Sequence, residues 1–248
     1  IKSTYKKRFG HKINLKDPKT YTEKLQWLKL FYRNEKMPIC TDKYEVHDYL
    51  TKLGYKHLLN DVLGVYDNAN DIDFESLPNK FVAKTTNGCG SNLICKNKND
   101  LDWGKWKKIM NSWLKLNLYA FGREWNYKGV KPRIIIEKLI EHDPFIDWNR
   151  VGFTYKKFTK SNHVLPLPPQ FEEMKALAKK LSASFPYVRV DFYNPIEGKI
   201  IFGELTYFPG SGLLPLVPLK NNYDEILGSQ LELPKLNHNL DLYNKINT

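Results

Sequence analysis

Hydrophobic and polar positions repeat with helical spacing through the first part of the chain. Residues 20–30 combine a Thr-x-x-Glu capping box with leucines on one helical face and lysines between them. A second helix is predicted over residues 42–53, with Gly54 as its stop signal. We therefore expect an N-terminal helical segment over residues 1–60.

Beyond residue 58 the hydrophobic residues fall into short runs separated by polar turns, which is the pattern of strands. The predicted strands are residues 63–66, 80–84, 92–95 and 133–140, and the predicted helices are residues 102–118 and 172–183. Alternating helices and short strands predict an α+β protein with more than one sheet.

Two late segments, residues 188–191 and 202–206, flank a turn and predict a β-hairpin. Side-chain direction repeats every two residues along a strand, so Arg189, Asp191 and Glu204 would project from one face. Crowded carboxylates repel unless a cation joins them, and Mg²⁺ takes oxygen ligands while keeping sites open for phosphate oxygens. The alternative is an exposed hairpin with a cross-strand ion pair.

A small, polar loop over residues 86–91 separates two of the predicted strands. Its glycines, Gly88 and Gly90, would let backbone N–H groups approach phosphate oxygens, with Ser91 beside them. Lys84, at the end of the entering strand, would neutralise the same phosphate. The loop lacks the Gly-Lys-Ser/Thr of a P-loop and opens onto a strand, so the dinucleotide fingerprint is also absent. The alternative is an ordinary hairpin turn.

The composition is that of a globular protein. The chain has 248 residues, 42% of them hydrophobic, and no apolar run approaches the roughly 18 residues of a membrane span. The cysteines Cys40, Cys89 and Cys95 show no metal-ligand spacing, so we expect free thiols in a reducing cytosol. The chain starts at Ile1 without an initiator Met or signal peptide, so we expect further sequence upstream.

The net charge of +12 favours an anionic partner, such as nucleic acid, a nucleotide, an acidic polysaccharide or an anionic membrane. Tryptophans and lysines interleave over residues 103–108. We interpret this stretch as an amphipathic helix with its tryptophans toward the core, and the alternative is a nucleic-acid surface.

Two further features keep a structural and a functional interpretation. His142 and His163 have no second His or Cys at ligand spacing, so we expect both to be solvent-exposed loop histidines. Residues 123–125, Arg-Glu-Trp, form either a structural ion pair over the indole or a contact to a nucleotide or acceptor.

The order of these features along the chain resembles the layout of the ATP-grasp superfamily. The resemblance covers nearly the whole chain and is closest to the TupA-like (teichuronopeptide biosynthesis) family of bacterial surface-polysaccharide gene clusters. The stretches that carry it are residues 23–28, 77–82, 122–125, 131–135 and 202–212.

The resemblance implies an α+β fold in which two lobes with antiparallel sheets grip ATP between them, preceded by the helical segment. The implied division is residues 1–60 for the helical segment, 61–140 for the nucleotide-binding lobe with the glycine loop, and 141–248 for the lobe with the metal site.

The resemblance also assigns roles to individual residues. Lys43 and Lys84 would bind the nucleotide, with Lys84 reaching the α- and β-phosphates. Arg189 would steady the transferred phosphoryl group, so Arg189 and Lys84 are the expected catalytic residues. The other expected contacts are the loop over the phosphates (Gly88, Gly90, Ser91), the adenine hinge (Glu137, Lys138, Leu139, Ile140) and the Mg²⁺ ligands (Asp191, Glu204, Thr206).

Two positions depart from the superfamily pattern. Thr206 stands where many members have an Asn that ligates metal, so its hydroxyl would coordinate the ion or hold a ligating water. After the adenine hinge, members usually continue with an acid for the ribose and two basic antiparallel strands, whereas here Asp143 is followed directly by Pro144. We expect a few tens of residues to be absent from the numbering at this point.

The implied activity is that of an ATP-dependent carboxylate–amine ligase, which forms an amide through an acyl phosphate with Mg²⁺. The expected acceptor is a hexuronic acid of a capsule, O-antigen or wall polysaccharide, as a glycan or a nucleotide- or lipid-linked sugar. The expected amine is an amino acid or another small amine, and nucleic acid is not an expected partner. The expected location is the cytoplasm, with peripheral contact at the anionic inner face of the cell membrane. Two alternatives stay open: a sugar or glycan kinase of the same fold, and a non-catalytic polyanion-binding protein.

Overall fold

The computed structural model describes residues 1–140, 154–155, 167–195, 198–217, 222–236 and 238–247. The chain divides into two compact units, each assembled from separate stretches of sequence. The sheet unit consists of Glu35–Asp143 and Asp191–Leu205, and the helical unit of Ile1–Asn34, Pro144–Val190 and Thr206–Thr248. The predicted domain boundaries stay a prediction, and the junction of Asp143 with Pro144 lies outside the described residues. Among the described helices, none has the length and hydrophobicity that a transmembrane span requires.

A four-stranded antiparallel sheet organises the sheet unit. In spatial order its strands are β1 (Val62–Tyr66), β4 (Ile134–Lys138), β2 (Phe81–Thr85) and β3 (Asn92–Cys95). The strands at these four positions are confirmed. β4 lies between two neighbours, which explains its β-branched run Ile134–Ile136, because a central strand is buried on both faces.

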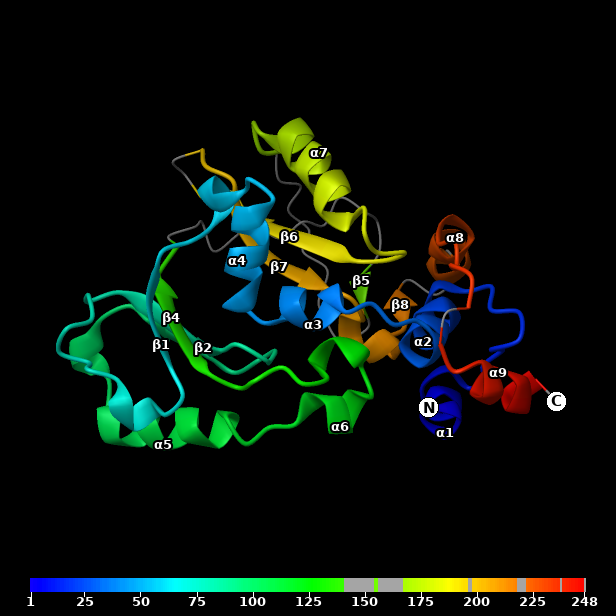
Figure 1. Ribbon diagram of the computed structural model, residues 1–248, viewed down its shortest axis with the longest axis horizontal. Helices are drawn as coiled ribbons and strands as arrows, with labels where there is room; N and C mark the ends of the chain where they lie inside the picture. The colour runs from blue at the N-terminus through cyan, green and yellow to red at the C-terminus, as the bar shows by residue number, and fades with distance from the viewer. Residues whose placement is uncertain (141–153, 156–166, 196–197, 218–221, 237, 248) are drawn as a thin grey trace. The chain divides into compact units, whose positions relative to one another are not determined.

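The two faces of this sheet have different environments. The fully buried side chains of one face are Phe81, Ala83, Ile134 and Ile136. They pack with Met110 of α5 (Trp103–Trp113), which runs along the sheet in Figure 1. Side chains alternate along a strand, so Lys84 and Glu137 project from the opposite face. That second face carries the charged residues of the unit's cavity.

Helix α5 confirms the amphipathic interpretation of the Trp-Lys stretch. Trp103, Trp106 and Trp113 pack against the core, whereas Lys105 and Lys108 are exposed. The predicted C-terminal end of this helix at residue 118 is wrong. The helix stops at Trp113, and the side chain of Asn117 accepts the Ala120 N–H to cap a new short helix, α6 (Leu118–Gly122).

The sheet unit contains two more helices and several 3₁₀ turns. Their bounds are α3 (Lys36–Thr41), α4 (Glu45–Lys52), η1 (Lys56–Leu58), η2 (Ala69–Asp71), η3 (Lys98–Asp100) and η4 (Trp125–Tyr127). Helix α4 starts three residues later than predicted, because Asp42 Oδ1 accepts the N–H groups of Tyr44 and Glu45 in the preceding turn. Its predicted stop is confirmed, since Gly54 adopts φ +85°.

The helical unit is built around α2 (Tyr21–Phe31), whose predicted capping box between Thr20 and Glu23 is confirmed. The other elements of the unit are α1 (Lys2–Phe9), α7 (Phe171–Ser182), α8 (Tyr223–Gln230), α9 (Leu240–Asn247), η6 (Pro209–Gly212) and the paired strands β5 (Thr154–Tyr155) and β8 (Leu216–Val217). Asp224 links α8 to α2 by two hydrogen bonds. Its carboxylate accepts them from the backbone N–H and the hydroxyl of Thr22, at 2.8 and 2.7 Å.

The predicted late hairpin is confirmed as the two-stranded sheet of β6 (Arg189–Tyr193) and β7 (Ile201–Thr206). Gly203 brings these strands together closely, because a Cβ at that position would lie 2.9 Å from the carbonyl oxygen of Asp191. The boundary between the two units falls within both strands. Asp191 and Glu204 therefore belong to the sheet unit, whereas Arg189 and Thr206 belong to the helical unit.

Candidate functional site

A partly open cavity lies in the sheet unit. Its lining residues are Lys43, Val46, His47, Asn60, Lys84, Glu137, Ile140, Tyr193, Phe202 and Gly203. They come from the α4 region, the loop before β1, strands β2 and β4, and the β6–β7 hairpin. The walls combine two lysines and one carboxylate with apolar side chains, a combination suited to a ligand with an anionic end and a flat apolar end.

An ion pair between Lys84 and Glu137 forms the charged part of this cavity. Lys84 Nζ lies 2.5 Å from Glu137 Oε2, and the two side chains are 20% and 8% exposed. The register explains the contact: Glu137 is paired with Val82, so Lys84, two residues further along β2, lies diagonally opposite on the same face. The structure thus brings together two of the residues predicted to bind a nucleotide.

Lys43 connects the start of the α4 region to the glycine loop. Its Nζ donates to the carbonyl oxygen of Gly88 at 2.5 Å. Burial lowers the pKa of Lys43, and the nearby Lys84 lowers it further, while the carboxylates of Glu204 and Glu137 act in the opposite direction. An anionic ligand would raise this pKa again, because phosphate oxygens favour the charged form of a lysine.

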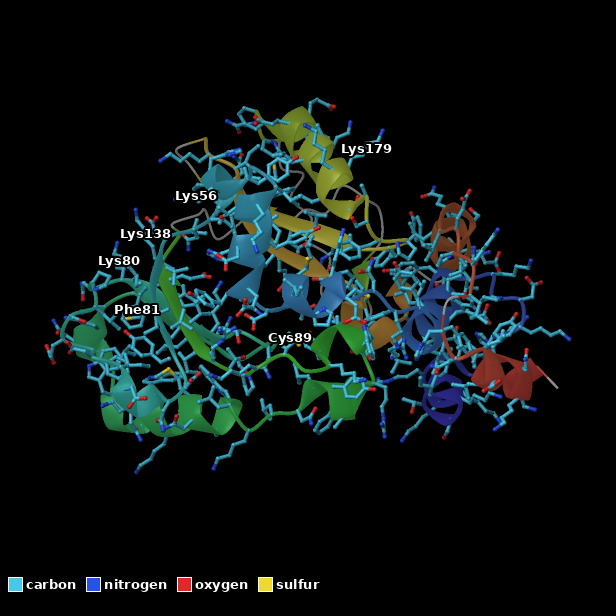
Figure 2. The ribbon with its side chains drawn as sticks, in the orientation of Figure 1. Lys56, Lys80, Phe81, Cys89, Lys138 and Lys179 are labelled. Carbon is cyan, nitrogen blue, oxygen red and sulfur yellow. The ribbon has the colours of Figure 1, made fainter. Side chains whose placement is uncertain are left out.

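The glycine loop joins β2 to β3, and the predicted strand–loop–strand order is confirmed as an antiparallel hairpin; its contact with phosphate stays a prediction. Gly90 adopts φ +78°, a conformation that favours glycine. At Gly88 a Cβ would lie 2.5 Å from the Thr85 hydroxyl oxygen, so a larger residue would displace the loop. Ser91 is buried, whereas Cys89, labelled in Figure 2, is exposed.

Four charged residues that were predicted to form the site influence the pKa of one cavity residue, Tyr193. Burial raises the pKa of Tyr193, the carboxylates of Glu204, Glu137 and Asp191 raise it too, and Lys84 lowers it. All four groups therefore lie within electrostatic range of Tyr193, although they come from four different strands. The carboxylate of Glu204 also raises the pKa of Lys43, so it lies within electrostatic range of both Lys43 and Tyr193.

The predicted Mg²⁺ ligands of the sheet unit are Asp191 and Glu204, one on each strand of the β6–β7 hairpin. Among the described residues no group of three or more His, Cys, Asp or Glu side chains could hold a metal alone. The donor type of Asp191 and Glu204 is compatible with Mg²⁺, because this ion keeps several waters or phosphate oxygens and needs only one or two protein carboxylates; their role as ligands stays a prediction. In the helical unit, Arg189 Nη2 donates to Thr206 Oγ1 at 3.2 Å.

The predicted adenine hinge is only partly represented in the cavity lining. Glu137 and Ile140 line the cavity. Lys138 projects from the other face of the sheet, where its side chain is 67% exposed and lies 3.9 Å from Asp61 Oδ2. Its carbonyl oxygen accepts from Asn60, which does line the cavity. The backbone near residue 138 therefore reaches the site although this lysine side chain does not.

The structure adds cavity residues that the sequence patterns did not single out. His47 lies one helical turn after Lys43, and burial lowers the pKa of its imidazole, with Lys84 acting in the same direction. Tyr193 lies two residues after Asp191, and Phe202 two residues before Glu204. The same periodicity rules that identified the charged residues would have identified these neighbours.

Of the two features that kept alternative interpretations, the described residues include only the Arg-Glu-Trp segment. His142 and His163 lie outside the described residues. In the Arg-Glu-Trp segment the cation over the Trp125 indole is Lys128, whose Nζ lies 4.4 Å from the ring centroid. Arg123 instead ends α6 in a left-handed conformation with φ +56°.

Comparison with known proteins places the chain in a family. The sequence profile of the TupA-like ATPgrasp family matches residues 23–147 and 144–232. No curated protein matches the chain. Among solved structures, the D-alanine–D-alanine ligase from Helicobacter pylori matches with 19% sequence identity and a TM-score of 0.47, over 88% of this chain and 68% of that one. The matched residues make up well over half of the chain, and the chain therefore belongs to the TupA-like ATP-grasp family.

Proposed function

We propose that the protein is an ATP-dependent carboxylate–amine ligase whose nucleotide site is the cavity of the sheet unit. One observation carries the proposal: Lys43, Lys84 and Glu137 line one cavity of the sheet unit, and the carboxylates of Asp191 and Glu204 lie within electrostatic range of Tyr193 in its wall. A chain of an ATP-grasp family with that set of charges has what a nucleoside triphosphate requires: cations for phosphates and oxygens for Mg²⁺.

The nucleotide would occupy the cavity with its phosphates toward the two lysines. Lys43 and Lys84 would neutralise phosphate charge, and the backbone of the loop with Gly88 and Gly90 would approach phosphate oxygens. The base would meet the apolar side chains Val46, Ile140 and Phe202. Glu137, at this end of β4, would accept a hydrogen bond from the adenine amino group.

Asp191 and Glu204 would hold Mg²⁺, with waters or phosphate oxygens at its remaining positions. When bound, the ion would neutralise charge on the phosphates.

The proposed reaction has two steps. An acceptor carboxylate attacks the γ-phosphorus of ATP, which forms an acyl phosphate and releases ADP. An amine then attacks the acyl carbon, forms the amide bond and expels inorganic phosphate. Two anions meet in the first step, so the main task of Lys84 is to cancel charge and align the reactants.

The family resemblance and the basic composition support an anionic acceptor. We propose a hexuronic acid of a bacterial capsule, O-antigen or wall polysaccharide as acceptor, with an amino acid or amino alcohol as the amine. The reaction would take place in the cytoplasm or at the inner face of the cell membrane. A chain with net charge +12 suits both an anionic glycan and an anionic lipid surface.

Hydroxylamine trapping tests this function without knowledge of the natural amine. The protein would be incubated with ATP, Mg²⁺, hydroxylamine and UDP-glucuronic or UDP-galacturonic acid, followed by measurement of ADP and of hydroxamate. The ligase predicts hydroxamate in proportion to ADP, dependent on Mg²⁺ and reduced in Glu204→Gln. A stable phosphate ester in place of hydroxamate would identify a kinase, and the absence of ADP with both sugars would rule out these nucleotide-linked hexuronates as acceptors.

A further inference from the structure

Half of the net charge of the chain is concentrated in residues 2–19. This stretch contains seven Lys and Arg residues and one Asp, a net charge of +6 against +12 for the whole chain. All seven cationic side chains are exposed. Among the described residues, Lys19 is the one member of the seven with an ion pair, to Asp17 at 2.8 Å. We call residues 2–19 the basic segment.

The fold of the basic segment directs its cations to solvent. In α1 the buried side chain is Tyr5, whose hydroxyl lies 3.0 Å from Thr22 Oγ1 of α2. Tyr5 also stacks on Phe9, with ring centroids 4.3 Å apart. The aromatic side chains thus face inward, and the other positions of α1 are left to Lys2, Lys6, Lys7 and Arg8.

Helix α9 adds exposed apolar side chains next to the basic segment. Leu240 is 61% exposed and Leu242 is 38% exposed. Tyr243 of the same helix packs edge-on against Phe31 of α2, and its hydroxyl donates to the carbonyl oxygen of Lys16 at 3.4 Å. α1 and α9 are therefore both fastened to α2, and Figure 1 draws the three helices close together.

This combination fits the headgroup region of an anionic bilayer. Lysine and arginine on long stems attract anionic headgroups, and leucines beside them can enter the interface, so the two contributions act together. A single-stranded nucleic acid would instead need exposed aromatic rings on which bases stack. Tyr5 and Phe9 stack on each other, so the basic segment offers no such platform.

We propose that the basic segment and the exposed leucines of α9 form one docking surface for an anionic membrane. The inference deepens the membrane contact proposed above by naming the residues that make it. It does not depend on ligase chemistry, because vesicle binding needs neither nucleotide nor acceptor. The surface would hold the protein where lipid-linked sugars are available.

Sedimentation with vesicles tests the proposal directly. The whole chain is mixed with vesicles of phosphatidylcholine alone or with 30% phosphatidylglycerol, without nucleotide, over a series of salt concentrations. We expect binding to the mixed vesicles that weakens as salt increases, and little binding to phosphatidylcholine alone. The triple variant Lys6→Gln/Lys7→Gln/Arg8→Gln should bind about a hundredfold more weakly, at roughly fivefold per cation.

A charge-matched variant separates this surface from net charge alone. Lys56→Gln/Lys108→Gln/Lys179→Gln removes the same charge from exposed positions elsewhere, two of which are labelled in Figure 2. It should bind vesicles like the wild type, whereas Leu240→Asn/Leu242→Asn should lose the binding that persists at high salt. Equal weakening in both triple variants would overturn the proposal. So would a lack of binding to the mixed vesicles, or binding of duplex DNA that the α1 variant alone loses while vesicle binding is unaffected.

Discussion

Lys84 Nζ and Glu137 Oε2 lie 2.5 Å apart across β2 and β4, in the wall of the cavity. Both residues are expected to contact a nucleotide, one at its phosphates and the other at its base. In the protein without nucleotide each charge compensates the other, which allows both side chains to be mostly buried. A nucleotide would replace part of this compensation with its own phosphate charge.

Removing either partner of this pair should destabilise the sheet unit. We expect Glu137→Gln or Lys84→Met to lower the free energy of unfolding by roughly 3 kcal/mol, because each leaves one buried charge without its partner. The double variant Lys84→Met/Glu137→Gln should recover part of that loss. Urea unfolding of all four proteins gives the coupling energy. Strictly additive losses would show that the two charges do not stabilise each other.

The affinity for ATP should depend on pH through Lys43. Burial lowers the pKa of Lys43 in the free protein, and bound phosphate would raise it again. Affinity should therefore be greatest below the pKa of the free protein and should fall as pH rises through it. Each unit of difference between the two pKa values corresponds to about a tenfold change in affinity.

Titration of ATP into the wild type and Lys43→Arg between neutral and alkaline pH measures this dependence. Arginine stays charged throughout, so the variant should lack this part of the pH profile. If the two proteins show the same decline, another group is responsible for it.

Gly212→Ala should destabilise the helical unit more than an ordinary positive-φ substitution. Gly212 has φ +63°, and a Cβ there would lie 2.6 Å from Gln26 Nε2. Gln26 has little room to move, because it is fully buried and its amide donates to the carbonyl oxygens of Ser211 and Gly212.

Gly10→Ala is the matched control for this substitution, since Gly10 has φ +82° and a Cβ there would have no heavy atom within 4 Å. We expect the free energy of unfolding, measured with heat or urea, to be roughly 1–3 kcal/mol lower for Gly212→Ala than for the control, because only Gly212→Ala overpacks its surroundings. Equal losses would mean that Gln26 and its neighbours adapt to the methyl group.

Asp224 should make the stability of the helical unit depend on pH. Burial raises the pKa of Asp224 above its ordinary 3.8, so the folded state holds this proton more tightly than the unfolded state. The stabilisation from this proton is complete below the unfolded pKa and is lost as pH rises through the folded pKa. The stability of the wild type relative to Asp224→Asn should therefore decrease over that range. Urea unfolding of both proteins at several pH values measures this difference in stability. A difference that increases with pH would contradict the effect of burial on Asp224.

Local patterns were sufficient to predict most strands of the sheet unit and several residues near its cavity, among them Lys84, which lines it. Strand alternation identified Asp191 and Glu204, and the loop between two strands identified Gly88 and Gly90. These predictions hold because periodicity and turn chemistry depend on neighbouring residues. The roles of these residues toward a nucleotide stay predictions.

Features that depend on tertiary contacts were not predictable in the same way. The start of α4 depends on Asp42. The carboxylate oxygen Oδ2 of this residue accepts a hydrogen bond at 2.9 Å from Nη2 of Arg133, which lies 91 residues further along the chain. Lys138 follows Glu137 directly, yet alternation in β4 places its side chain on the face away from the cavity. The contact of Gln26 with Ser211 joins two sequence motifs 185 residues apart, and no local pattern relates them.

Calorimetric titration of Mg²⁺ and ATP tests the nucleotide site most directly. It would use the wild type, the fold-compensated double variant Lys84→Met/Glu137→Gln, and Lys56→Met as a control from the exposed surface. We expect one ATP per chain for the wild type and the control, and at least tenfold weaker binding for the double variant, because its cavity has lost a phosphate cation and the carboxylate charge expected at the adenine amino group. Wild-type protein that does not bind ATP, or a folded double variant that binds it equally well, would contradict the assignment of this cavity to a nucleotide.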